Sequence, residues 1–85
     1  MKRATAATLD RLKLLLAQLR PHDRLKENSR GVFCCRSRAV LHFHEDPAGL
    51  FADLRESGDW QRFAVNTAPE QAALVLTIAR FVAAR

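Results

Sequence analysis

The chain has 85 residues, a formal net charge of +5 and 14 basic side chains, most of which are arginine. Hydrophobic residues make up 48% of it, which excludes a wholly disordered polypeptide. A chain of this length buries roughly 60–65% of its unfolded surface, enough for one modest core but not for a deep substrate cavity as well. We therefore expect a single domain spanning residues 1–85, and the sequence leaves open whether residues 1–7 are ordered.

The basic character admits nucleic acid or an acidic protein as a partner. No apolar run approaches the ~18 residues of a membrane span, and Asp10, Arg11 and Lys13 interrupt the stretch after the basic N-terminus, so we expect no signal peptide. Cys34 and Cys35 are adjacent, and adjacent residues of a strand point to opposite faces, so a disulfide between them is not expected. Unpaired thiols fit a reducing compartment, and we expect a cytoplasmic protein.

The first predicted element is a helix over residues 8–20, because its leucines recur with helical spacing. Thr8 is a suitable N-cap, although Thr5 would allow an earlier start, and Pro21 disfavours helical geometry at the residue before it. Residues 21–30 are polar and basic, and predict a connection. The helical stripe consists of Leu9, Leu12, Leu15, Leu16 and Leu19.

From residue 31 the apolar period changes to two, which is typical of strands. Four strands are predicted, at Gly31–Cys35, Ala39–Glu45, Leu50–Arg55 and Trp60–Asn66. The links between them are short and rich in turn-forming residues, at 36–38, 46–49 and 56–59. Such links require antiparallel neighbours, because a parallel crossover takes about a dozen residues.

A second helix begins at a capping box formed by Thr67 and Glu70, with Pro69 in its first turn. Its apolar stripe consists of Leu74, Val75, Ile78, Phe81 and Val82. The predicted fold class is therefore α+β. We expect a four-stranded antiparallel meander with an N-terminal and a C-terminal helix packed on one face, in the order α-β-β-β-β-α.

The apolar pattern also predicts the register. Pairing Glu45 with Leu50 brings Phe43 opposite Ala52, whereas a slip of one residue would put Phe43 against Asp53. The face that the helices cover, called the covered face, then carries Phe33, Cys35, Leu41, Phe43, Leu50, Ala52, Leu54, Phe63 and Val65. The opposite face, called the open face, carries Val32, Cys34, Val40, His42, His44, Phe51, Asp53, Arg55, Trp60, Arg62 and Ala64. Two rows are expected across it, Val32–His42–Asp53–Arg62 and Cys34–Val40–Arg55–Trp60.

His42 and His44 put two imidazoles on one side of a strand, and with Asp53 they offer ligands for zinc. An H-x-H pair alone is a weak signal, and no second Cys or His pair stands at zinc-ligand spacing elsewhere in the sequence. The simpler interpretation is a polar pair across the strands, in which His42 donates to Asp53 and Asp53 also pairs with Arg62. We favour this pair, and predict no metal and no other cofactor.

Cys34 beside His42 and Asp53 also suggests a thiol nucleophile with a base and an orienting carboxylate. A flat strand face provides no oxyanion hole and no helix N-terminus aimed at the thiol. A cysteine that packs as a small hydrophobic residue is the commoner case. We therefore predict no catalytic residues, and a metal- or thiol-dependent enzyme is the third hypothesis.

Nucleic acid is the second hypothesis for the open face. Trp60 opposite Arg55 predicts a cation–π contact, and an aromatic ring beside basic residues is also a platform on which a base stacks. Arg36 and Arg38 flank a tight turn, where they would grip a phosphate, and Arg62 adds a further charge. The sequence contains no aromatic consensus of an RNA-binding module, so we place this hypothesis below that of a protein-interaction domain.

The leading hypothesis is a non-catalytic binding or interaction domain. Four open-face residues, Val32, Val40, Phe51 and Trp60, together exceed the apolar surface that a monomer usually exposes. Association with a second copy would bury them, and twofold symmetry is the commonest arrangement. We therefore expect a homodimer, or docking to another protein, through the open face, and no membrane partner.

The segment LHFHEDPAGLFADL, Leu41–Leu54, belongs to a stretch from Ala39 to Arg55 that resembles a set of short uncharacterised bacterial proteins. Residues 63–67 and Glu70 continue the resemblance, which covers about half of the chain. The resemblance implies a small α+β domain and no particular activity. Cys34 and Cys35 lie outside the matching residues, so the resemblance lends no support to a cysteine mechanism.

Overall fold

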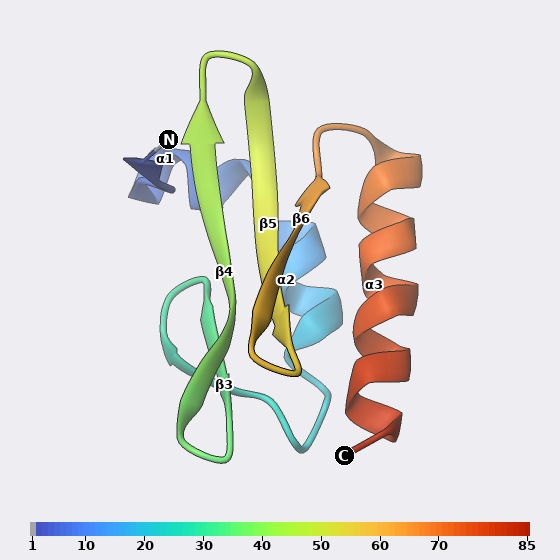
Figure 1. Cartoon of the computed structure of the whole chain (residues 1–85). Coiled ribbons are helices and arrows are strands. Elements are labelled where there is room, and N and C mark those ends of the chain that lie inside the picture. Colours follow the sequence, from blue (N-terminus) through green and yellow to red (C-terminus); the bar gives the residue numbers. More distant parts are fainter. Residues whose placement is uncertain (1) are drawn as a thin grey trace.

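The computed structural model describes residues 2–85, which form one antiparallel sheet with helices on one side of it (Figure 1). The helices are α1 (Ala6–Arg11), α2 (Lys13–Leu19) and α3 (Ala68–Ala83). The strands are β1 (Lys2–Arg3), β2 (Lys26–Ser29), β3 (Val32–Cys35), β4 (Arg38–Asp46), β5 (Gly49–Glu56) and β6 (Asp59–Ala64). The predicted α+β class, the antiparallel sheet and the helices at both ends of the chain are confirmed.

The predicted strand count, four, is wrong, because two short strands join the four expected ones. The sheet order is β2-β3-β4-β5-β6. Strand β1 pairs with the same edge of β4 as β3 does, with Lys2 opposite Glu45. β2 lies in the segment predicted to be a connection. Both added strands are polar and lack apolar alternation, so pairing with a neighbour, rather than a pattern of their own, makes them strands.

The sequence leaves open whether residues 1–7 are ordered. Met1 lies outside the described residues, and Lys2 and Arg3 form β1.

The register of the central strands is confirmed. Phe43 lies opposite Ala52, and the last three members of the predicted row Val32–His42–Asp53–Arg62 run across β4, β5 and β6. The apolar side chains of these strands therefore reach the covered face, while the histidines and Asp53 reach the open face. The register is fixed by this period of two, because a shift of the pairing by one residue would move the apolar side chains to the open face and the polar ones to the covered face.

The register predicted between β3 and β4 is confirmed at Phe33 and wrong for the residues that follow it. Cys34 lies opposite Ala39 rather than Val40, which makes Val40 the extra residue of a β-bulge. A bulge disturbs the alternation of side chains along the strand that carries it. Val40 is consequently buried in the hydrophobic core instead of lying on the open face.

The N-terminal helix is interrupted once. A single helix over residues 8–20 was predicted, whereas α1 and α2 are separated at Leu12, where φ is −102° and ψ is 12°. Thr5, and not Thr8, is the N-cap, and its hydroxyl accepts the Thr8 N–H at 3.4 Å. The earlier start is fixed by Glu45 of β4, whose Oε1 accepts the Thr5 N–H at 2.8 Å and the Thr8 hydroxyl at 2.7 Å. The leucine stripe tolerates the break, and all five of its leucines are buried.

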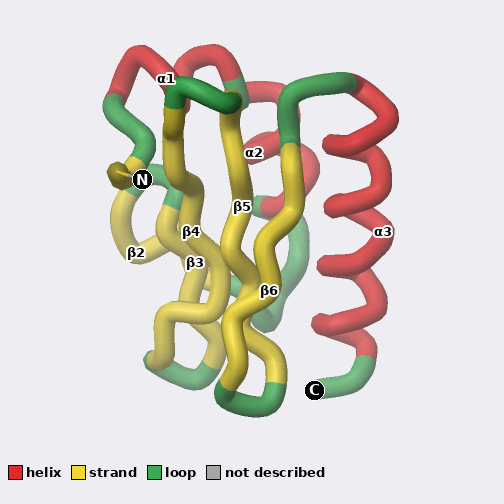
Figure 2. The backbone as a smooth tube through the Cα atoms, turned by 45° about the horizontal axis from the view of Figure 1, so that its top comes forward, coloured by secondary structure: helices red, strands yellow, loops and turns green. Residues whose placement is uncertain are grey.

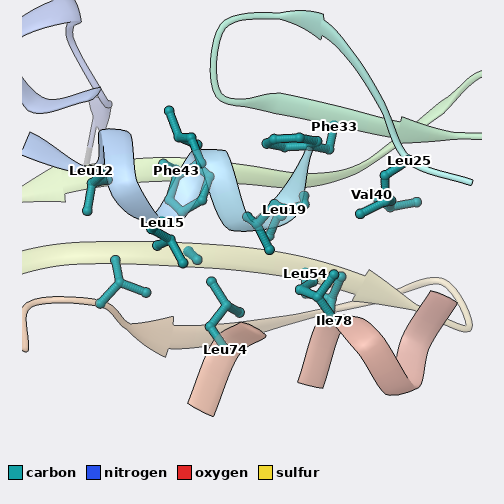
Figure 3. Packing of buried hydrophobic residues seen from close by; sticks show 14 of the residues in the cluster. Leu12, Leu15, Leu19, Leu25, Phe33, Val40, Phe43, Leu54, Leu74 and Ile78 are labelled. Carbon is teal, nitrogen blue, oxygen red and sulfur yellow. The ribbon is translucent and has the colours of Figure 1, made fainter. Parts of the chain in front are cut away.

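Helix α3 begins at the predicted capping box. The Thr67 hydroxyl accepts the Glu70 N–H at 3.3 Å, and Glu70 Oε1 accepts the Thr67 N–H at 3.0 Å. Among the described helices, none has the length and apolar character that crossing a membrane requires. Side chains of α2, α3 and β5 meet in the interior, as Figure 3 shows for Leu15, Leu19, Leu54, Leu74 and Ile78.

Two hairpin turns and the end of α3 lie at the same end of the molecule (Figures 1 and 2). Arg36 and Ser37 link β3 to β4 with φ values of 53° and 68°, and Ser57 and Gly58 link β5 to β6 with φ values of 50° and 93°. Two-residue links with positive φ at both positions match the right-handed twist of the paired strands. They turn the chain tightly enough to hold side chains from both links near the C-terminal end of α3.

Candidate functional site

A row of side chains in contact crosses the open face. The Arg55 guanidinium lies over the Trp60 ring, 4.9 Å from its centroid, which confirms the predicted cation–π contact. The Trp60 ring centroid lies 4.5 Å from that of His42, and the His42 centroid lies 4.6 Å from that of His44. Pairing of β4, β5 and β6 positions the row, because residues facing one another across a ladder share one face of the sheet.

Asp53 is the anionic centre of this face. It is only 6% exposed, and it accepts two hydrogen bonds of 2.8 Å from Arg62, Nε to Oδ1 and Nη2 to Oδ2. This bidentate ion pair lowers the pKa of Asp53 and raises that of Arg62. The predicted pair is confirmed, and Arg62 is therefore engaged with Asp53 rather than free for an anionic ligand.

The histidines do not form the polar pair expected from the sequence. The hydrogen bond from His42 to Asp53 is not observed, and it is His44 whose Nε2 lies 3.3 Å from Asp53 Oδ2, without hydrogen-bond geometry. Nδ1 of His42 and both ring nitrogens of His44 are buried and have no hydrogen-bond partner within residues 2–85. Desolvation and the nearby His44 lower the pKa of His42, which favours its neutral imidazole.

These three residues are close enough to hold one metal ion together. One ligating atom from each of His42, His44 and Asp53 lies within 4.8 Å of the other two. Two imidazole nitrogens and one carboxylate oxygen are ligands that divalent transition metals accept.

Cys34 is separated from this group. It lies opposite Ala39, three positions along β4 from His42, so the thiol and the base of the nucleophile hypothesis do not share a row. Cys34 is buried, and its sulfur accepts a hydrogen bond from Asn28 Nδ2 at 3.2 Å. The thiol is thus packed within the fold, as a small hydrophobic side chain is, and lies apart from His42 and Asp53.

A second candidate site lies at the end of the sheet where the two turns meet α3. A hollow of about 520 Å³ opens there, and Phe81 and Val40 are among the residues that line it. Its charged lining consists of four arginines, Arg36, Arg38, Arg55 and Arg85, and we call it the arginine hollow. Within the described part of the chain, no acidic side chain lines it and no ion pair engages any of the four.

Two of these arginines are held in place by contacts that leave part of the guanidinium free. Arg55 Nη2 donates to the carbonyl oxygen of Ala39 at 2.7 Å, in addition to its contact with Trp60. The Arg85 guanidinium lies over the Phe81 ring, 4.1 Å from its centroid. A guanidinium carries five N–H donors, so both side chains retain donors for a bound oxyanion.

The residues predicted from the sequence thus fall into two neighbouring groups. The first group is His42, His44, Asp53 and Arg62, and the second is Arg36, Arg38 and Arg55. Trp60 connects them, because it contacts both Arg55 and His42. Arg85 was missed, and no pattern in the sequence links the last residue of the chain to a turn some fifty residues earlier.

The apolar part of the open face is smaller than predicted. Val40 is buried, Val32 and Phe51 are half-buried, and only Trp60, at 43%, is an exposed large apolar residue on this face. On this face, Arg55 lies over the Trp60 ring and Arg62 is paired with Asp53.

The chain matches no protein-family model, no curated protein and no solved structure.

Proposed function

We propose that the chain is a small, non-catalytic binding domain whose ligand is single-stranded nucleic acid. The observation that supports this best is the arginine hollow, which is lined by four arginines, with no acidic side chain among the described residues that line it. Arginine binds phosphate with two parallel hydrogen bonds. Like charges gathered in one place repel one another, so a phosphate bound among them would relieve the repulsion.

Trp60 favours single-stranded nucleic acid over a small anion. Its ring packs against Arg55, which lines the arginine hollow, yet the residue is still 43% exposed. Stacking of a base on an aromatic side chain contributes about 1–3 kcal/mol and needs an unpaired base. A strand with one phosphate in the hollow and the adjacent base on Trp60 would use both features.

The test is binding of a fluorescently labelled single-stranded oligonucleotide, followed by anisotropy over a salt series. R36Q/R38Q should weaken binding and reduce the slope of log K against log salt by about 1.4, because each lost phosphate contact on a single strand contributes about 0.7. The matched control is R11Q/K13Q, which removes the same charge from α1 and α2. Equal losses of affinity in both variants would mean that the oligonucleotide is attracted by the net positive charge and not by the arginine hollow. No binding of the wild type at low salt would refute the proposal.

Self-association through the open face is the second candidate, because Trp60 is exposed beside half-buried Phe51 and Val32. Arg55, which lies over the Trp60 ring, opposes it, since a twofold axis would bring like charges together. Light scattering across a concentration series measures the mass of the wild type and of W60A. A dimer that W60A dissociates would favour self-association, and a monomer at all concentrations would exclude it.

We also propose a cytoplasmic location. Cys34 and Cys35 are both free and buried, which suits a reducing compartment where thiols are not oxidised. Intact mass of the protein purified without reductant should show two unmodified thiols. A disulfide-linked or thiol-adduct form as the main species would contradict this location.

A further inference from the structure

The strongest cluster that the nucleic-acid proposal leaves unexplained is the group His42, His44 and Asp53. His42 and His44 stand two residues apart on β4 and therefore point to the same face, and Asp53 of β5 lies directly opposite His42. His44 Nε2 and Asp53 Oδ2 are 3.3 Å apart. Two ligands about 2.0–2.1 Å from a tetrahedral metal ion lie about 3.3–3.4 Å from each other, so this pair already has the required separation.

The unpaired ring nitrogens are an independent observation that points to a ligand. His42 Nδ1, His44 Nδ1 and His44 Nε2 are all buried without a hydrogen-bond partner among residues 2–85. Buried polar atoms are nearly always paired, and an unpaired one calls for an explanation such as an ion. A neutral imidazole offers one lone pair, and coordination of a metal ion satisfies it.

Arg62 acts as the outer support of the cluster. Its two hydrogen bonds fix the plane of the Asp53 carboxylate while each carboxylate oxygen keeps a further lone pair. Carboxylates that bind metal ions are commonly held in this way by a second residue. The arrangement therefore presents Asp53 in one orientation, next to the two imidazoles.

We propose that His42, His44 and Asp53 form a binding site for a divalent transition-metal ion of the zinc class. Three protein ligands leave the fourth position of a tetrahedral site, which water or a donor atom of a bound molecule would fill. The site does not depend on nucleic-acid binding, since it uses none of the residues of the arginine hollow.

Trp60 provides a local reporter. It is the single tryptophan of a chain without tyrosine, and its ring lies 4.5 Å from that of His42. Cobalt(II) bound at the site should quench the fluorescence of Trp60, and added Zn²⁺ should restore it by displacement. The untagged full chain is used, and Zn²⁺ stoichiometry is measured separately by equilibrium dialysis.

The variants are H42Q and H44Q, with H22Q as the matched control because His22 lies in the α2–β2 connection, outside the cluster. We expect one Zn²⁺ per chain, at least tenfold weaker binding and lost quenching in H42Q and H44Q, and wild-type behaviour in H22Q. C34S/C35S, which removes both thiols, should also bind as the wild type does. Circular dichroism verifies that each variant is folded.

Three results would overturn the site. The first is no Zn²⁺ retained by the wild type at micromolar concentration. The second is an equal loss in H22Q and H44Q, which would mean adventitious binding to surface imidazoles. The third is a loss in C34S/C35S, which would move the metal to the thiols.

Discussion

The two faces of the sheet are stabilised by different interactions. The covered face is apolar, and its side chains pack against leucines of α2 and the stripe of α3 in a single buried cluster. The open face instead joins side chains one to the next, from the Asp53–Arg62 ion pair through the histidines to Trp60 and Arg55. Burial of apolar area does not depend on direction, whereas ion pairs and ring contacts do.

This difference separates stability from function. A substitution on the covered face removes packing that no other residue replaces, so its main effect is on folding. A substitution on the open face removes one directed contact and leaves the core intact, so its main effect should be on binding. The predictions below test that separation, beginning with the largest expected effect on stability.

Phe43→Ala should reduce the free energy of unfolding by roughly 3–5 kcal/mol, because Phe43 is 2% exposed and its removal leaves a cavity on the covered face. Urea unfolding measures the loss. The control is Leu76→Ala on α3, where the side chain is 53% exposed, and a change within about 0.5 kcal/mol is expected. An unchanged midpoint for Phe43→Ala would contradict the assignment of the covered face.

Arg62→Gln should be the most destabilising of the open-face changes, since it leaves the nearly buried Asp53 carboxylate without its partner. The pKa of Asp53 is lowered from 3.8 in the folded protein, so its contribution is present above pH 3.8 and is lost as pH falls through the lower folded value. Urea unfolding at several pH values should show a difference from the wild type that shrinks below pH 3.8. A difference that is the same at every pH would show that charge is not its cause.

Thr67→Ala should cost about 1 kcal/mol, because it removes the acceptor for the Glu70 N–H at the start of α3. Thermal unfolding monitored by circular dichroism is sufficient to detect this. Thr77→Ala is the matched control, since the Thr77 hydroxyl donates to a carbonyl within α3 and caps no terminus. Equal losses in the two variants would mean that the capping box contributes little.

Glu45→Gln should have the smallest effect of the four, because the amide oxygen can still accept from the Thr5 N–H and the Thr8 hydroxyl, and only the additional strength of hydrogen bonds to a charged acceptor is lost. These hydrogen bonds and nearby Lys2 lower the pKa of Glu45 from 4.5 to about 2. The carboxylate therefore adds stability above pH 4.5 that is lost as pH falls toward 2. Melting temperatures across this range should fall less steeply for the variant, and identical slopes would refute the contact with α1.

Local patterns were sufficient for much of the fold. The alternation of β4 and β5 determined which side chains reach each face, because a slip of one residue would bury Asp53 on the covered face and expose Phe43. The capping box at Thr67 was readable because its two hydrogen bonds join residues three apart. The row His42–Asp53–Arg62 followed from the same register.

The sequence by itself therefore determined the α+β class, the register of the central strands and the row His42–Asp53–Arg62, since each depends on short-range periodicity. Only the tertiary structure decided the strands β1 and β2, the bulge that buries Val40, and the arrival of Arg85 at the arginine hollow. Each of these depends on contacts between distant segments, for which a polar or irregular stretch carries no periodic signal. The same holds for the unpaired imidazoles, because the orientation of a side chain within a row is set by its packing and not by its place in the sequence.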